Sequence, residues 1–503
     1  MNGLEMLITE YLARLRGVYF LKQYLVIIAL FVFGAILTDT VSKKSLSCVK
    51  RCALALPVGV CAFSVTAYAM LVTGIPYNTW TVVLFIAAEA LAALAVMRRS
   101  HGAPEAVRNM LIAFVVVLVA AALATSGIIP VSISNDTMYY FSRYPDAIVH
   151  FGYLRDQFDV FMTDTGLGSV CIDTLPALFG FGETFGLRES FHISFIAFFA
   201  SCVYERAKLR LCGKHAVIAS VVVTAVLVIS TPFVILGHWA LANMYFMELF
   251  FIAAYTLIDT QDDKIGVGPV LLLGLAFLRI EGTLFVLWLM LCVSVYRDIA
   301  RKLAIFVSVP MALLFGGYCF RLFVQFYLLD NIYVFLTPQK AVLLIASICA
   351  TGLYLLFIYP YVRKRFVRYM PYVYLIALAA GNILMFIRKP DLYVTNLTMF
   401  GQNLFRQSGW GVFPHFVIAM TVLLVIEYVL MYIRKKETAG AGCSFDITLT
   451  VGFILMVLAV SYGRGDSLTA YVGDSGNRVL LQVVPLIVMT YAGLFIGLIG
   501  EEQ

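Results

Sequence analysis

The sequence predicts an all-α polytopic membrane protein, and three observations favour this class. Of the 503 residues, 62% are hydrophobic and 13% are charged, whereas an ordinary soluble domain carries about 25% charged residues. The apolar residues gather into blocks that suit helices of about 20 residues, the length that crosses a hydrocarbon core. The blocks lack the short alternating pattern of a membrane barrel, so helices are the structures that can satisfy their backbone hydrogen bonds in lipid.

We expect about 14 to 15 spanning helices from the apolar blocks. The blocks begin near residues 24, 52, 80, 109, 192, 216, 240, 265, 283, 303, 341, 371, 416, 447 and 479. Residues 1–108 are expected to form an N-terminal amphipathic helix and extra transmembrane helices, and residues 109–503 a transmembrane core. The core carries a long polar loop at 131–190, in which amphipathic stretches such as 150–162 predict short interfacial helices.

Basic residues lie in short turns between the blocks, which predicts that these turns are cytoplasmic. The alternation leaves 131–190, the turns at His238 and Arg279, and the segments 327–340, 388–415 and 462–478 on the outer side. It also places residues 1–22 outside despite their cations, so the first block is either re-entrant or an exception to the rule. Because topology explains the formal charge of +7, we expect no nucleic-acid partner. Cysteine and histidine positions predict no disulfide, metal or cofactor.

The first candidate site follows directly on the block that ends near residue 130. It holds Asn135, Asp136, Tyr139 and Tyr140, with Arg143 shortly after. A carboxylate at the membrane surface could accept a proton from an acceptor hydroxyl as a general base. The alternative is that Asp136 simply caps the following helix.

The second candidate is the turn Arg279-Ile280-Glu281-Gly282, between two apolar runs that are short for spanning helices. Charges placed there are costly and are either paired with each other or functional. The third is Asn477-Arg478 before the last block, where Arg478 either reaches the interface or holds a phosphate with two hydrogen bonds. Further outer cations suited to a phosphate are Arg388, Lys389 and Arg406, and His238 lies among them.

Taken in order, these motifs resemble the GT-C class of membrane glycosyltransferases, which use a polyprenyl-phosphate-linked sugar as donor. The resemblance covers roughly residues 109–499. It rests on the acidic motif at Asn135 and Asp136, the Arg279-Ile280-Glu281-Gly282 turn, and Arg478-Val479-Leu480 leading to Pro485. The chain departs from the family in having three blocks before the acidic loop and in carrying Asn243 where many members have an acid.

The resemblance implies an inverting sugar transfer on the extracytoplasmic face of a cell membrane, to a glycan, lipid or protein acceptor. Asp136 would be the catalytic base. The substrate-binding residues would be Asn135, Tyr139, Tyr140, Arg143, His238, Arg279, Glu281, Arg388, Lys389, Arg406, Asn477 and Arg478. Two other functions fit the same pattern, namely a flippase for lipid-linked oligosaccharides and an envelope polysaccharide polymerase or ligase.

Overall fold

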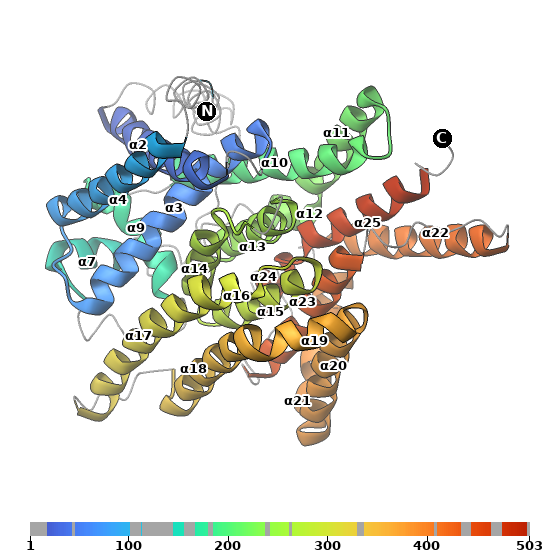
Figure 1. The fold of residues 1–503 in the computed structure, drawn as a ribbon. Coiled ribbons are helices and arrows are strands. Elements are labelled where there is room, and N and C mark those ends of the chain that lie inside the picture. Colours follow the sequence, from blue (N-terminus) through green and yellow to red (C-terminus); the bar gives the residue numbers. More distant parts are fainter. Residues whose placement is uncertain are drawn as a thin grey trace, which may run out of the picture. The chain divides into compact units, whose positions relative to one another are not determined.

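The computed structural model describes residues 18–42, 46–100, 112, 144–154, 166–179, 185–236, 242–260, 264–328, 336–406, 410–433, 444–463 and 475–499. Throughout these ranges the regular elements are helices, and none is a strand (Figure 1). Within them seven helices are long and apolar enough to cross a membrane. The prediction of an all-α polytopic membrane protein is therefore confirmed.

The long helices follow the apolar blocks; of the block near residue 109 only residue 112 is described. The α-helices are α2 (Val18–Ser42), α3 (Cys48–Thr73), α4 (Thr79–Ser100), α7 (Tyr144–Phe151), α9 (Leu167–Leu178), α10 (Phe185–Lys208), α11 (Gly213–Ile229), α12 (Thr231–Leu236), α13 (Ala242–Asp259), α14 (Gly268–Leu278), α15 (Gly282–Tyr296), α16 (Ala300–Leu303), α17 (Val309–Leu328), α18 (Pro338–Leu353), α19 (Tyr359–Phe366), α20 (Met370–Arg388), α21 (Pro390–Phe405), α22 (Phe413–Ile433), α23 (Ser444–Gly463), α24 (Ser475–Leu481) and α25 (Val484–Ile499). Two π-helical turns, η3 (Ala304–Ser308) and η4 (Tyr354–Ile358), and one 3₁₀ turn, η5 (Val367–Tyr369), join consecutive helices. The total number of spans stays a prediction.

The chain divides into two compact units. Unit 1 comprises residues 1–198, 239–290 and 297–360, and unit 2 comprises residues 199–238, 291–296 and 361–503. The boundary proposed from the sequence, at residue 108, falls within unit 1, and the assignment of a separate N-terminal part stays a prediction.

Helix α13 is the centre of unit 1. Every residue from Ala242 to Leu257 is buried, as expected for a helix that is apolar on all its faces. Other helices of unit 1 are less buried than α13. In α3, 78% of the span is buried, and in α4 only 11%. Large apolar side chains such as Trp80 and Leu84 stay exposed on α4. A surface of that kind is suited to lipid.

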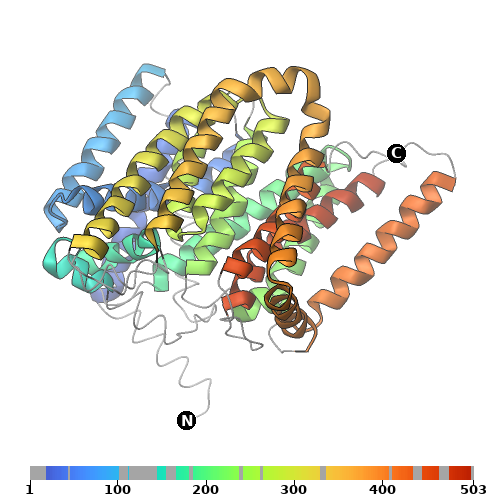
Figure 2. The ribbon, with the colours of Figure 1, turned by 90° about the horizontal axis from the view of Figure 1, so that it is seen from below.

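Helices α2 and α3 approach each other at two glycines. A Cβ on Gly34 would lie 1.8 Å from the carbonyl oxygen of Ala55, and one on Gly59 would lie 2.0 Å from the carbonyl oxygen of Leu30. Small residues that let two backbones touch are characteristic of helix pairs in membranes. Elsewhere in unit 1, α17 and α18 run side by side, as Figure 2 shows.

One end of unit 1 is held by ion pairs from turns that the sequence predicts to be cytoplasmic. Lys50 Nζ at the start of α3 lies 2.6 Å from a carboxylate oxygen of Asp259 at the end of α13. Arg51 pairs with Asp39 near the end of α2. Arg297 donates a 2.5 Å hydrogen bond to the carbonyl oxygen of Leu257. These cations therefore join helix ends as well as carrying the charge that predicts topology.

The opposite end of unit 1 carries α7 and α9, from the segment predicted to be an outer loop. The Tyr77 amide donates to the carbonyl oxygen of Gly152, 2.7 Å away. Helix α7 ends at Phe151, and Gly152 has φ 76. The prediction of a helix over 150–162 is thus wrong for the described residues 152–154, because the backbone leaves helical geometry at this glycine. Residues 155–162 lie outside the described residues.

In unit 2, α23 packs against α20, α21 and α25. Asn382 of α20 donates to the carbonyl oxygen of Leu455 at 3.1 Å, and Asn396 of α21 donates to that of Ser461 at 3.2 Å. Arg206 pairs with Asp446 at the start of α23. An apolar groove of about 680 Å³ lies between α22, α23 and α25.

Candidate functional site

The turn between α14 and α15 is a compact polar structure in an apolar surrounding. Arg279 is the C-cap of α14, in extended conformation, and its Nε donates to Glu281 Oε1 at 2.7 Å. One terminal nitrogen also lies 2.7 Å from Glu281 Oε1, and the other donates to Asn243 Oδ1 of α13. The structural pair between Arg279 and Glu281 is present, and Asn243 extends it to the central helix.

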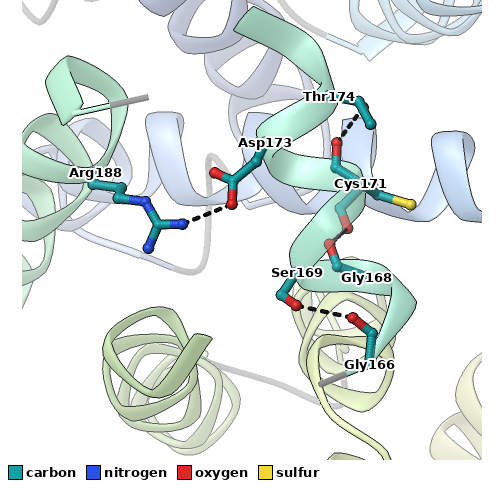
Figure 3. Close-up of polar contacts among 8 residues, drawn as sticks. Gly166, Gly168, Ser169, Cys171, Asp173, Thr174 and Arg188 are labelled. Carbon is teal, nitrogen blue, oxygen red and sulfur yellow. Dashed lines mark hydrogen bonds and ion pairs between the residues drawn. The ribbon is translucent and has the colours of Figure 1, made fainter. Parts of the chain in front are cut away.

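The start of α9 lies directly on this turn. A Cβ on Gly166 would lie 2.4 Å from the carbonyl oxygen of Leu278 and 2.5 Å from Arg279 Cα, and one on Gly168 would lie 2.5 Å from the carbonyl oxygen of Phe277. Gly166 has φ 85, a conformation that favours glycine. Ser169 Oγ donates to its carbonyl oxygen at 2.9 Å (Figure 3). Only glycines allow this close approach of the α9 segment to the turn.

Tyr77, between α3 and α4, supports α9 from another side. Its hydroxyl lies 2.6 Å from Thr174 Oγ1 of α9. Burial raises the pKa of the Tyr77 hydroxyl well above its ordinary value, so this group stays a neutral hydrogen-bonding partner. Thr79 adds a 3.0 Å hydrogen bond to the carbonyl oxygen of Leu178 at the end of α9. Helix α9 is thus fixed at both of its ends.

Arg321 of α17 joins two further segments at this end of unit 1. Its guanidinium donates to the carbonyl oxygen of Leu71, near the end of α3, at 3.4 Å, and also to that of Leu154, after α7. In the structure it satisfies backbone carbonyls at the ends of two elements.

Replacing Arg321 with Met is expected to lower the free energy of unfolding by about 2 kcal/mol, because charged hydrogen bonds to two carbonyls are lost. Unfolding of the purified protein in detergent measures this change. Arg301→Met is the matched control, since Arg301 of α16 is exposed and its replacement should change stability by less than about 0.5 kcal/mol. Equal stability of the two variants would contradict the role given to Arg321.

A buried charge cluster, comprising Asp173, Arg188, His192 and Glu248, lies near the same end of unit 1. Arg188 of α10 donates to Asp173 of α9 at 2.6 Å, and Figure 3 shows the two side chains pointing toward each other. His192 Nδ1 contacts Glu248 Oε1 of α13. The Arg188 guanidinium also lies 4.9 Å from the centre of the Tyr245 ring.

Sequence reasoning did not select this cluster. Its signal was present, because Glu248 and His192 interrupt apolar blocks, and ionisable residues inside a membrane span are candidates for function by default. Glu248 lies five residues after Asn243 on α13, which is about 7.5 Å along the helix axis. On α13, Glu248 therefore follows Asn243, the partner of Arg279, by about one and a half helical turns.

Several of the sequence-predicted site residues lie outside the described residues. These are Asn135, Asp136, Tyr139, Tyr140, Arg143 and His238. Arg279 and Glu281 are brought together with Asn243 as described. Asn477 and Arg478 belong to the short helix α24, and α25 follows with Pro485 in its first turn. Among the described residues no group of three or more potential ligands is placed to hold a metal ion.

The predicted phosphate-binding cations Arg388, Lys389 and Arg406 form two separate groups. Arg388 and Lys389 lie exposed where α20 meets α21, and Arg406 caps the other end of α21. Helix α21 has 16 residues, so these groups are separated by about 24 Å. One phosphate cannot contact both. Gly411, five residues after Arg406, packs on Thr231 of α12, and α12 contacts α24, the helix that carries Arg478.

The arrangement at the α7 and α9 end of unit 1 combines a fixed arginine, a buried charge cluster and a polar segment of the chain. Comparisons of the chain with protein-family models, with curated proteins and with solved structures find no match. Its function is therefore argued from its own residues.

Proposed function

We propose that this protein transfers a sugar from a polyprenyl-phosphate-linked donor to an envelope acceptor, in the manner of the GT-C glycosyltransferases that its motifs resemble. The observation that carries the proposal is the meeting of two motif-bearing regions at one end of unit 1. Gly166 and Gly168, at the start of α9 in the acidic segment, lie on the Arg279 turn. Asp136 precedes α7 of the same segment by eight residues, a chain length of at most about 28 Å.

In the proposed reaction the Asp136 carboxylate accepts the proton of an acceptor hydroxyl as that oxygen bonds to the anomeric carbon. The bond between this carbon and the phosphate oxygen breaks, and the electron pair leaves with the lipid phosphate. Attack from the face opposite the phosphate inverts the anomeric carbon. Negative charge grows on the phosphate, and arginine forks stabilise it in a site with little water. The resemblance assigns the role of phosphate ligand to Arg478.

Arg279 has a different role in this proposal. Its pairing with Glu281 and Asn243 holds it in place, so its proposed role is to fix the turn on which the start of α9 packs. The alternative function, a flippase for lipid-linked oligosaccharides, would move the same substrate without forming a bond. An envelope polymerase or ligase would form a bond but with a larger donor.

Asp136→Asn is expected to lower the transfer rate by a factor of about 10² to 10⁴, the usual contribution of a general base. The assay uses native protein in liposomes, radiolabelled polyprenyl-phosphate hexoses as donors, and a membrane extract from cells that lack this chain as acceptor. Product formation and release of polyprenyl phosphate are both measured. Gel filtration of each variant shows whether it is folded.

The matched control is Asp146→Asn, which changes an exposed acid of α7 in the same segment and should transfer at the native rate. If Asp136→Asn transfers as fast as the native protein, Asp136 is not the base. Movement of the donor across the bilayer without a new bond would favour the flippase. Transfer of long glycans but not single hexoses would favour a polymerase or ligase.

A further inference from the structure

The buried charge cluster places four ionisable side chains inside unit 1, away from solvent. The side chains of Arg188 and Asp173 are 1% and 0% exposed, and those of His192 and Glu248 are 2% and 0% exposed. They come from three helices, α9, α10 and α13, that meet near the Arg279 turn. Nothing in the proposed sugar transfer uses them.

The four groups are close enough to influence one another. Arg188 pairs with Asp173, and its positive charge also acts on Glu248 and on Tyr245. Arg188 from α10 thus acts on the Glu248 of the pair, and Tyr245 from α13 lies within the influence of Arg188, Glu248 and Asp173 of α9. The thiol-bearing Cys61 of α3 lines the same small cavity as Tyr245. The rings of Phe191 and Phe195 complete the surroundings.

Counting charges limits how many protons the cluster can hold. Arginine stays protonated in proteins, so Arg188 and the Asp173 carboxylate together have no net charge. The pair of His192 and Glu248 is neutral in two arrangements, either imidazolium with carboxylate or imidazole with carboxylic acid. Both arrangements contain the same single exchangeable proton. Losing it would leave a buried negative charge and adding another a buried positive charge, and both are costly in an apolar interior.

We propose that His192 and Glu248 form a proton-binding site that holds one proton, and that the ion pair of Arg188 and Asp173 sets this number. The proton lies between His192 Nδ1 and a Glu248 carboxylate oxygen, the atoms in contact. The number of protons on His192 and Glu248 is the one that leaves the four side chains of the cluster with no net charge. If Asp173 lost its charge, the pair would give up its proton so that the Glu248 carboxylate balances Arg188.

Proton release on unfolding measures the occupancy of this site. At about pH 8 an unfolded chain carries no proton on glutamate or histidine, whose ordinary pKa values are about 4.3 and 6.5. Native protein in a weakly buffered detergent solution is unfolded with SDS and urea, and a pH indicator dye reports the released protons. We expect the native protein to release about one proton per chain more than Glu248→Gln, which removes the carboxyl group but keeps the side-chain shape.

Two further variants separate the proposal from a merely structural role. His192→Gln should release as many protons as the native protein, because neutrality then requires Glu248 to be protonated. Asp173→Asn should release one fewer, although Asp173 does not contact the proton. His150→Gln, an exposed histidine of α7, is the control and should match the native protein.

Equal release from the native protein and Glu248→Gln would overturn the proposal, and so would native release from Asp173→Asn. The experiment needs no sugar donor, so its outcome is independent of the proposed transfer. Each variant is compared after gel filtration in the same detergent. If one of Glu248→Gln and Asp173→Asn does not fold, the other still decides the result.

Discussion

Replacing Arg188 with Met is expected to lower the free energy of unfolding by about 3 to 5 kcal/mol, the cost of breaking a buried ion pair by removing one partner. Asp173 is fully buried, so its carboxylate would either stay charged without the cation that pairs with it or take up a proton. The contact between the guanidinium and the Tyr245 ring would be lost as well. Unfolding of the purified protein by SDS in mixed micelles measures the change.

The control for this prediction removes both charges together. Arg188→Met combined with Asp173→Leu leaves no buried charge in this pair, and apolar replacement of a whole buried pair is often neutral or stabilising. We therefore expect the double variant to recover most of the stability that the single variant loses. A double variant as unstable as the single one would show that shape, and not charge, decides stability at this position.

Gly34→Ala is expected to separate α2 from α3 and to cost about 1 to 3 kcal/mol or more, the range for added volume in a packed interior. The new methyl group would lie 1.8 Å from the carbonyl oxygen of Ala55 and 2.5 Å from the backbone nitrogen of Gly59. Backbone atoms cannot move aside as the end of a flexible side chain can. The thermal unfolding temperature in detergent should fall clearly.

Gly316→Ala in α17 is the matched control for Gly34→Ala. A Cβ added there meets no atom within 4 Å, and alanine favours a helix by about 0.5 to 1 kcal/mol over glycine. The control should thus be as stable as the native protein or more so. If Gly34→Ala is no less stable than Gly316→Ala, the close approach of α2 and α3 does not contribute to stability.

Much of the fold could be predicted because its signals are local. The apolar blocks predict long helices such as α2, α3, α13 and α23, and the charged residues between two short blocks predict the Arg279 turn and its pairing with Glu281. The same reasoning placed a helix over 150–162, where Gly152 ends α7 instead. It also grouped Arg388, Lys389 and Arg406, which α21 separates by its own length, because the sequence of 388–415 had been read only as an outer segment.

The buried cluster could be predicted only in part. Glu248 and His192 each interrupt an apolar block, which indicates a special role, but the pattern does not show which residue each of them faces. Asp173 and Arg188 appeared among the charges of a polar segment, where solvent would be their ordinary partner. The proposed catalytic role of Asp136 and the phosphate-binding role of Arg478 stay predictions.

The sequence by itself determined the class of this protein, because hydropathy and chain length decide which segments can be helices in a membrane. The tertiary structure decided which charges meet. Lys50 with Asp259 and His192 with Glu248 join helices that are far apart in the sequence, and Arg188 with Asp173 joins the consecutive helices α9 and α10. Helical periodicity fixes the face on which a residue lies, whereas the partner on that face depends on how the helices pack, and glycines such as Gly34 and Gly168 set that packing by allowing backbones to touch.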